Sequence, residues 1–287
     1  MRKKLKFVII PLILVLLLVG VPALALFGFG GSDFFLLKDE SGEVKKISSK
    51  EYIYGVINAE LPETFEPEAI KAVAVAAYTL AVRRQSVQGF ITADSATFQA
   101  YKKPNKSTDK FAKIKSCVDE VYGEILVYEN KPILAAYHAL SSGRTENCGD
   151  IWSQDLPYLK SVDSAFDKDV AGFEQVLELS LVDFAKLLGV PETESIEIKS
   201  RTNSETVTEL SVGDSTFTGQ KTRELLSLGS SNFEIKREEK LLRITTKGHG
   251  HGIGLSQYGA NSLAVSGKNY KEILGWYYTD VEIVKWS

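Results

Sequence analysis

The sequence predicts an α+β protein, in which a helical part is followed by a lobe of short strands and helices. Two observations predict this class. Residues 68–84 are rich in alanine and other apolar residues, which is typical of a helix packed closely against other helices. Residues 171–246 instead contain short runs in which apolar and polar residues alternate, the pattern of strands with one buried face. We therefore expect a single domain at residues 34–287, with an extra lobe at about 171–246.

The first residues are typical of a membrane anchor. Four basic residues stand within the first six positions, and residues 7–32 carry no charge. That stretch is longer than the apolar h-region of a secretory signal, which has about 7–15 residues, and it is long enough to cross a bilayer, which takes about 20 residues. We predict a basic cytoplasmic tail at 1–6 and a transmembrane helix at 7–29, with the domain outside by the positive-inside rule. Residues 23–25 (Ala-Leu-Ala) resemble a signal-peptidase site, so cleavage stays an alternative.

The helical part is predicted from its start and stop signals. After a short glycine-rich linker, a strand is expected near Phe34–Lys38. Ser48 and Glu51 have the spacing of a capping box and predict the start of a helix. That helix should end at residues 60–62, because the residue before a proline disfavours the helical conformation. Pro67 suits the first position of the second helix, which we expect to run to about residue 84.

The remaining elements follow in chain order. Residues 102–110 are polar and predict a surface loop, and residues 123–139 predict strands, one of which ends at His138. In the lobe we expect strands at 173–179, 195–200, 207–212, 233–236 and 241–246, with a helix at 182–188. A glycine-rich loop, a helix at 270–278 and a strand at 281–285 close the chain.

Charge and cysteine content limit the function. The first six residues hold four of the 34 basic residues, so the rest of the chain has 30 basic against 37 acidic residues. No basic cluster remains that would bind a nucleic-acid backbone, and we expect no nucleic-acid partner. Cys117 and Cys148 form one disulfide or remain free; both alternatives stay open.

Glu60 stands at the C-terminal end of the first predicted helix. The helix macrodipole disfavours negative charge there, and the neighbours Ile57, Ala59 and Leu61 are apolar. Both effects favour a neutral carboxyl group, which is the form that a general acid requires. Residue type alone leaves nearby glutamates equally plausible, namely Glu51, Glu63, Glu66 and Glu68.

Two other segments are candidates for lining a site. Residues 137–147 place polar side chains in a turn directly after an apolar strand, where clefts commonly form. Residues 248–259 contain five glycines, which permit close approach of the backbone to a ligand. In an extended segment His249 and His251 point to opposite sides, and His138 and Cys148 lack further ligands at the usual spacing. We predict no metal and no cofactor.

Five stretches in this order resemble the stage II sporulation protein D family, whose domain also occurs in amidase enhancers. They are residues 51–62, 67–77, 141–147, 157–163 and 248–259. The resemblance implies a lytic transglycosylase that cleaves peptide-free peptidoglycan between N-acetylmuramic acid (MurNAc) and N-acetylglucosamine (GlcNAc), forming 1,6-anhydro-MurNAc. It implies Glu60 as the catalytic acid. Substrate-binding roles are implied for Tyr158, Lys160, Asp167, His251, Ser256, Gln257, Tyr258, Ser141 and Asn147.

The resemblance also implies partners, and two alternative functions stay open. The partners are glycan strands, a cell-wall amidase of the stage II sporulation protein P type and other sporulation membrane proteins, during septal thinning and engulfment. Two residues depart from the family pattern: Tyr78 replaces an arginine, for which Arg83 or Arg84 could substitute, and His249 replaces a tryptophan. One rival is a non-catalytic glycan-binding module that enhances an amidase. Another is a hydrolytic muramidase that uses Asp94 or Asp150 as second carboxylate.

Overall fold

The computed structural model describes residues 33–286, except residues 40, 93–97, 153, 194 and 240. The helices are α3 (Ser49–Glu60), α4 (Pro67–Gln88), α5 (Asp109–Val121), α6 (Cys148–Ile151), α7 (Leu181–Leu188), α8 (Gly219–Leu226), α9 (Gln257–Val265) and α10 (Tyr270–Tyr277), with a 3-10 helix η2 (Ala165–Asp169). The strands are β1 (Phe34–Lys38), β2 (Val44–Ser48), β3 (Ile91–Thr92), β4 (Glu124–Tyr128), β5 (Lys131–Pro132), β6 (Tyr137–His138), β7 (Glu174–Ser180), β8 (Ile196–Arg201), β9 (Val207–Val212), β10 (Ser215–Thr218), β11 (Phe233–Glu238), β12 (Leu241–Lys247), β13 (Leu255–Ser256) and β14 (Glu282–Lys285). This mixture of helices and small sheets confirms the α+β class.

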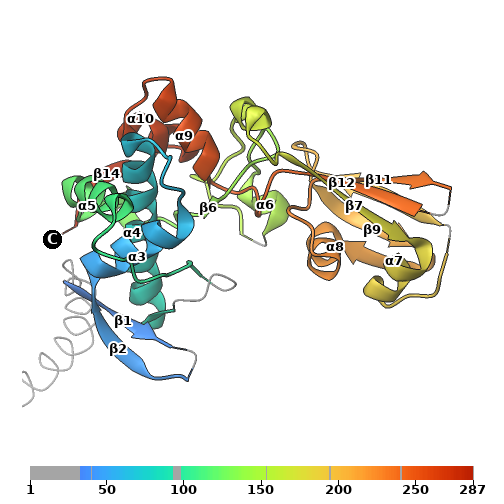
Figure 1. Ribbon diagram of the computed structural model, residues 1–287, viewed down its shortest axis with the longest axis horizontal. Coiled ribbons are helices and arrows are strands. Elements are labelled where there is room, and N and C mark those ends of the chain that lie inside the picture. The colour runs from blue at the N-terminus through green and yellow to red at the C-terminus, as the bar shows by residue number, and fades with distance from the viewer. Residues whose placement is uncertain are drawn as a thin grey trace, which may run out of the picture.

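Helix α4 is the centre of the helical part. It contacts α3, α5, α9 and α10, and Figure 1 shows these helices gathered at one end of the molecule. Small buried residues such as Ala72 and Ala76 let its neighbours approach, as the alanine-rich sequence predicts. Residues 69–82 of α4 are mostly apolar and buried, whereas its C-terminal turn is polar. Two small sheets, β2-β1-β3 and β14-β4-β5, complete this part.

The lobe at the other end has a hydrophobic core of its own. Sheets β11-β12-β7 and β10-β9-β8 form it together with α7 and α8 (Figure 1). Phe184, Leu210, Phe233 and Ile244 are buried in this second cluster of apolar side chains. The buried residues of this cluster are separate from those of the first core, so the lobe packs around a core of its own.

The glycine-rich segment links the two parts. β13 pairs in parallel with β6, so that Leu255 lies opposite Tyr137 and Ser256 opposite His138. Just before β13, Gly254 has a φ of +72°, and a β-carbon there would lie 2.1 Å from the carbonyl oxygen of Ala136. Only glycine fits this conformation at this distance, which explains one glycine of the motif.

Some local predictions are wrong for identifiable reasons. The Ser48 side chain makes no capping hydrogen bond, so the predicted capping box does not form, although the helix begins at Ser49 as its signals indicate. Helix α5 is not predicted from the sequence, because its N-cap lies within the polar stretch that we interpret as a loop. The N-cap is Thr108, whose side chain accepts a hydrogen bond from the Phe111 amide. Helices α8 and α9 were also missed. Both begin within loop-like, glycine-containing sequence.

Two predictions on the cysteines and the anchor have different outcomes. Cys117 and Cys148 are both buried and free, so no disulfide joins them. The predicted transmembrane helix at 7–29 lies outside the described residues. Within the described part of the chain, none of the helices combines the length and the apolar character that a membrane span requires.

Candidate functional site

Glu60 is the last residue of α3 and is half-buried. Its Oε1 accepts a hydrogen bond of 3.0 Å from the backbone amide of Ala100, and its Oε2 accepts one of 3.0 Å from Nε2 of Gln257. The carboxyl group is therefore held at both oxygens by segments that are distant in sequence. Each oxygen keeps a further lone pair for another partner.

A segment after α4 forms one side of this site. Gln99 is buried, and its amide donates to the Tyr137 hydroxyl at 2.9 Å and accepts from the Tyr52 hydroxyl at 3.2 Å. The ring of Tyr101 stacks on that of Tyr52 at 5.6 Å. This stacking requires Gly55, because a β-carbon at Gly55 would lie 2.2 Å from the Tyr101 ring. The segment thereby places the Ala100 amide against Glu60.

The start of α9 forms the other side. Ser256 is the N-cap of α9 and accepts a hydrogen bond from the Gly259 amide. Its hydroxyl donates to Oδ2 of Asp167 at 2.7 Å, and Asp167 also accepts from the Ser141 amide and the Ser164 hydroxyl. Burial raises the pKa of the Asp167 carboxyl group, while these donors act in the opposite direction. The network fixes the position from which Gln257 reaches Glu60.

The sequence-predicted substrate residues occupy different places. Gln257 lies at Glu60, whereas Asp167, Ser256 and Ser141 are buried together in the network behind it. The Tyr158 hydroxyl is buried and accepts from the Leu134 amide, so the residue belongs to the core. Tyr258 packs edge-on against Phe65.

Lys160 and Asn147 make local polar contacts. Lys160 forms an ion pair of 2.9 Å with Asp155. The Asn147 amide donates to Asp150 and accepts from the Ser161 amide. Both lie in the loops around α6, and neither is hydrogen-bonded to the residues around Glu60. Of the predicted substrate residues, Gln257 is thus the one that the structure places in hydrogen-bond contact with Glu60.

The tyrosine that replaces the family arginine lies away from the site. Tyr78 is buried and its ring contacts those of Phe35 and Tyr122, in the core beside β1 and α5. Arg83 donates to the carbonyl of Pro132 at β5. Arg84 lies over the ring of Phe98, one residue before Gln99, and so is the arginine nearest to this segment. Position 78 consequently has no direct effect on Glu60.

A cavity of about 440 Å³ lies next to the Gln99 segment. Its walls include Arg84, Phe98, Tyr137, Trp152 and His251. The first three come from the helical part: Tyr137 accepts a hydrogen bond from Gln99, and Arg84 lies over the ring of Phe98. Gln99 directly precedes Ala100, whose amide donates to Glu60. Aromatic walls with few charges suit the faces of sugar rings.

His138 and His251 form a neutral pair behind this cavity. Their ring centroids are 5.5 Å apart, and Trp152 lies 5.2 Å from His251. Burial, followed by the charge of His251, lowers the pKa of His138 to about 3. Burial, followed by the charge of Arg223, lowers the pKa of His251 to about 4. Both imidazoles are therefore neutral at neutral pH.

These histidines predict loss of stability in mild acid. Their pKa values in the folded protein lie below the unfolded value of 6.5, so the unfolded state binds more protons as the pH falls below 6.5. We expect the free energy of unfolding to fall by about 1.4 kcal/mol per histidine for each pH unit from 6.5 towards 4. Urea unfolding at several pH values measures this slope.

A matched pair of variants isolates the effect. His138→Gln should remove about half of the slope, whereas His249→Gln, at an exposed position, should leave most of it. Because Glu146 and Asp167, whose pKa values are raised by burial, act in the opposite direction at the lower pH values, slopes and not single stabilities are compared. An unchanged slope in His138→Gln would contradict the prediction.

Several residues of the site were not predicted individually. Tyr52, Gln99, Ala100 and Tyr137 surround Glu60, and of these Gln99 and Ala100 stand outside the segments singled out from the sequence. The available signal was a run of aromatic and polar residues at 98–101 directly after the alanine-rich helix. Among the described residues, no group of three or more histidine, cysteine, aspartate or glutamate side chains could hold a metal ion.

Comparisons with known proteins relate this site to a family. A model of the family described as stage II sporulation protein matches residues 38–128, which include Glu60 and the Gln99 segment. The chain is 37% identical to the stage II sporulation protein D of Bacillus subtilis over 258 residues, which cover 84% of this chain and 75% of that protein. The corresponding protein of Bacillus amyloliquefaciens matches at the same identity and coverage.

A more distant relative carries a different name. The chain is 28% identical over 283 residues to a Bacillus subtilis protein named amidase enhancer, covering 78% of this chain and 39% of that protein. The similarity therefore extends over the helical part and the lobe together.

Proposed function

The chain belongs to the stage II sporulation protein D family, and from this premise we propose that it is a lytic transglycosylase of peptide-free peptidoglycan. The cleaved bond joins MurNAc to GlcNAc, and the product ends in 1,6-anhydro-MurNAc. The observation that carries the proposal is the carboxyl group of Glu60, which is half-buried and held at both oxygens by the Ala100 amide and Gln257. The segment that contains Ala100 also contributes Phe98 to the wall of an aromatic cavity.

The reaction needs a single carboxyl group. Protonated Glu60 donates its proton to the glycosidic oxygen, and the bond from that oxygen to C1 of MurNAc breaks. The resulting carboxylate takes the proton from the C6 hydroxyl of the same MurNAc, whose oxygen forms the new bond to C1. No water is consumed, so the second carboxylate of hydrolytic glycosidases is not required. The Ala100 and Gln257 donors stabilise the carboxylate between the two proton transfers.

Gln257 is expected to contribute to the rate through this contact. Gln257→Ala removes one donor from the Glu60 carboxylate, and we expect a decrease in kcat of about 10- to 100-fold, which corresponds to the loss of one hydrogen bond to a charged group. The rate of release of anhydro ends measures it. Because Gln257 is held by the α9 cap and not the reverse, thermal unfolding should change little. A variant with unaltered kcat would remove Gln257 from the mechanism.

The activity is tested on defined substrates. The full chain is incubated with glycan strands from which an amidase has removed the peptides, and the products are analysed by mass spectrometry. Anhydro-MurNAc ends support the proposal. Reducing ends, heavier by one water, would indicate a muramidase, and intact strands under conditions where a control transglycosylase is active would overturn the proposal.

The relative named amidase enhancer supports a second candidate, a module that binds glycan and stimulates an amidase without cleaving strands. This candidate predicts binding without release of anhydro ends and a faster amidase in mixed reactions. For either function we propose as partners glycan strands, a sporulation cell-wall amidase and other sporulation membrane proteins.

We further propose that residues 7–29 anchor the protein in the cell membrane, with its N-terminus in the cytoplasm and the domain outside. The support is the uncharged stretch flanked by basic residues. Alkaline carbonate extraction should leave the full chain in the membrane fraction, and external protease should digest the domain on cells stripped of their wall. Recovery in the soluble fraction, or protection from the protease, would contradict this topology.

A further inference from the structure

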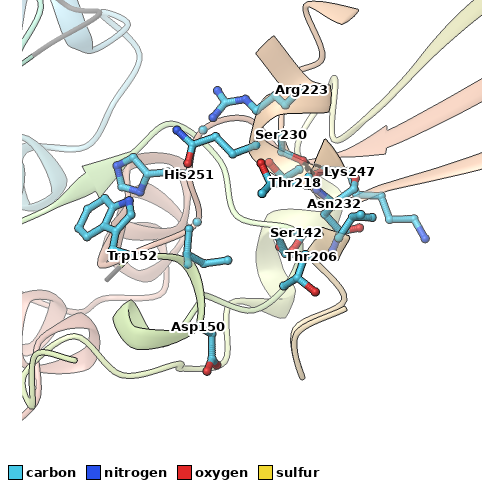
Figure 2. A pocket seen from close by; sticks show the side chains of 18 of the residues that line it. Ser142, Asp150, Trp152, Thr206, Thr218, Arg223, Ser230, Asn232, Lys247 and His251 are labelled. Atoms are coloured by element: carbon cyan, nitrogen blue, oxygen red, sulfur yellow. Dashed lines mark hydrogen bonds between the residues drawn. The ribbon is translucent and has the colours of Figure 1, made fainter. Parts of the chain in front are cut away.

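A second cavity lies between the helical part and the lobe. It has a volume of about 260 Å³. Residues from both parts line it, as Figure 2 shows. Trp152 and His251 lie on the side of the helical part, whereas Thr218, Arg223 and Ser230 come from the lobe. Trp152 and His251 also line the cavity beside the Gln99 segment, so the two cavities share a wall.

Three charged residues, Asp150, Arg223 and Lys247, line this second cavity. The Nε of Arg223 donates to the carbonyl of Leu228 at 3.3 Å, and among the described residues its guanidinium forms no ion pair. The neighbouring Lys221, in contrast, pairs with Glu224, and Lys247 at the rim pairs with Glu234. The terminal nitrogens of Arg223 therefore remain as donors for a ligand.

The surroundings of this charge are mostly neutral. Arg223 and His251 line the same cavity, and the positive charge of Arg223 contributes to the lowered pKa values of His138, His249 and His251. Burial lowers the pKa of Arg223, and the charge of Glu224 acts in the opposite direction. With the imidazoles neutral, the guanidinium shares the cavity with hydroxyl groups, the Trp152 ring and the Asp150 carboxylate, whose Oδ2 accepts a hydrogen bond from Asn147. Such a site favours a single anionic group attached to a polar, ring-shaped molecule.

We propose that Arg223 binds the free lactyl carboxylate of a MurNAc residue in the glycan strand, with Trp152 as the surface for its sugar ring. The proposal rests on the proposed function and names its specificity. In peptide-bearing strands the lactyl carboxyl group is an amide and carries no charge, whereas an amidase leaves it as a carboxylate. A guanidinium that pairs with carboxylates therefore distinguishes the amidase product from intact peptidoglycan.

The position of the cavity fits a strand that also reaches Glu60. The shared wall of Trp152 and His251 leads to Tyr137, which is joined through Gln99 to the segment that binds Glu60. MurNAc recurs at every second sugar. The carboxylate at Arg223 can thus belong to a different MurNAc from the one that is cleaved, and one strand can occupy both cavities.

Binding to two forms of the same strands tests the proposal. Peptide-free strands are used either with free carboxylates or after conversion of the carboxylates to neutral methylamides. Binding of the full chain carrying Glu60→Gln, which leaves the strands intact, is measured by titration. We expect about 10- to 100-fold weaker binding to the neutral strands, the loss that corresponds to one charge-assisted pair.

Variants on one helix supply the control. Arg223→Gln should bind the charged strands as weakly as the neutral ones, and Arg223→Lys should keep part of the difference. Lys221→Gln changes the same net charge at an exposed ion pair and should keep the full difference. Equal binding of both strand forms, or of neither, by the chain with Arg223 intact overturns the subsite, and this holds even if Arg223→Gln fails to fold.

The same data separate the subsite from the activity. Discrimination by Arg223 in a protein that releases no anhydro ends would refute the transglycosylase and retain the subsite. Release of anhydro ends without discrimination would refute the subsite alone.

Discussion

Glu60→Gln is expected to reduce the release of anhydro-MurNAc ends by about 10³- to 10⁴-fold, since in the proposed mechanism the residue gives one proton and takes another in the same turnover. Glutamine has the same shape but cannot transfer a proton. The rate of formation of anhydro ends from peptide-free strands, followed by mass spectrometry, measures the effect. Affinity for strands should remain, because the cavity walls are unchanged.

The fold of this variant should be preserved for a specific reason. The glutamine side chain at position 60 has one oxygen and one NH₂ group in place of the two carboxylate oxygens. The NH₂ group would therefore face one of the two donors, the Ala100 amide or the Gln257 amide. The Gln257 amide can rotate to offer its oxygen to this group, while the Ala100 amide keeps its acceptor. We expect a change in stability below about 1 kcal/mol.

A nearby glutamate serves as control. Glu63 is exposed, three residues after Glu60, and Glu63→Gln alters the same residue type close to the site. Its activity should equal that of the unaltered chain. Residual activity of Glu60→Gln near that of Glu63→Gln would assign the acid to another carboxyl group, and Glu146, buried near the second cavity with a pKa raised by burial, would be the first to test.

Local sequence signals predicted the position of Glu60 well. The start signal at Ser48 and the stop signal at Pro62 predict the two ends of α3, which runs from Ser49 to Glu60. The alanine content of α4 predicts the close packing of helices around α4. These features depend on neighbouring residues. The surroundings of Glu60 could not be predicted in this way, because Ala100 and Gln257 are 40 and 197 positions away in sequence and meet it only through tertiary packing.

Polar residue type was a weaker guide to roles within the motifs. The family resemblance implied substrate contact for Asp167 and Ser256, and in the structure both are completely buried, joined by a hydrogen bond. A carboxylate that accepts hydrogen bonds from a loop, a helix cap and a 3-10 turn organises those elements. The sequence does not reveal which polar residues of a motif are buried and which face a substrate. A site built from loops needs polar residues of both kinds.

Asp167→Ala is accordingly expected to destabilise the fold by about 2 to 4 kcal/mol. The Ser256 hydroxyl loses its buried acceptor, and an unsatisfied donor costs about 1 to 3 kcal/mol. The Ser141 amide and the Ser164 hydroxyl lose one partner each and keep second contacts with the Ser256 and Tyr277 hydroxyls. Denaturant unfolding at neutral pH measures the loss. Asp169→Ala, at an exposed position two residues on, should lie within about 0.5 kcal/mol of the unaltered chain.

The pattern of kinetic effects in this variant distinguishes a structural from a substrate-binding Asp167. If the residue only fixes Ser256 and thereby the start of α9, Asp167→Ala loses stability, and its kcat falls because Gln257 is no longer held at Glu60. If it contacts the strand, KM should rise while stability stays near that of Asp169→Ala. Because the Asp167 carboxylate is fully buried beneath the α9 cap, we expect the first pattern. One buried network then fixes the position of the Gln257 amide, which donates to the proposed catalytic carboxyl group of Glu60.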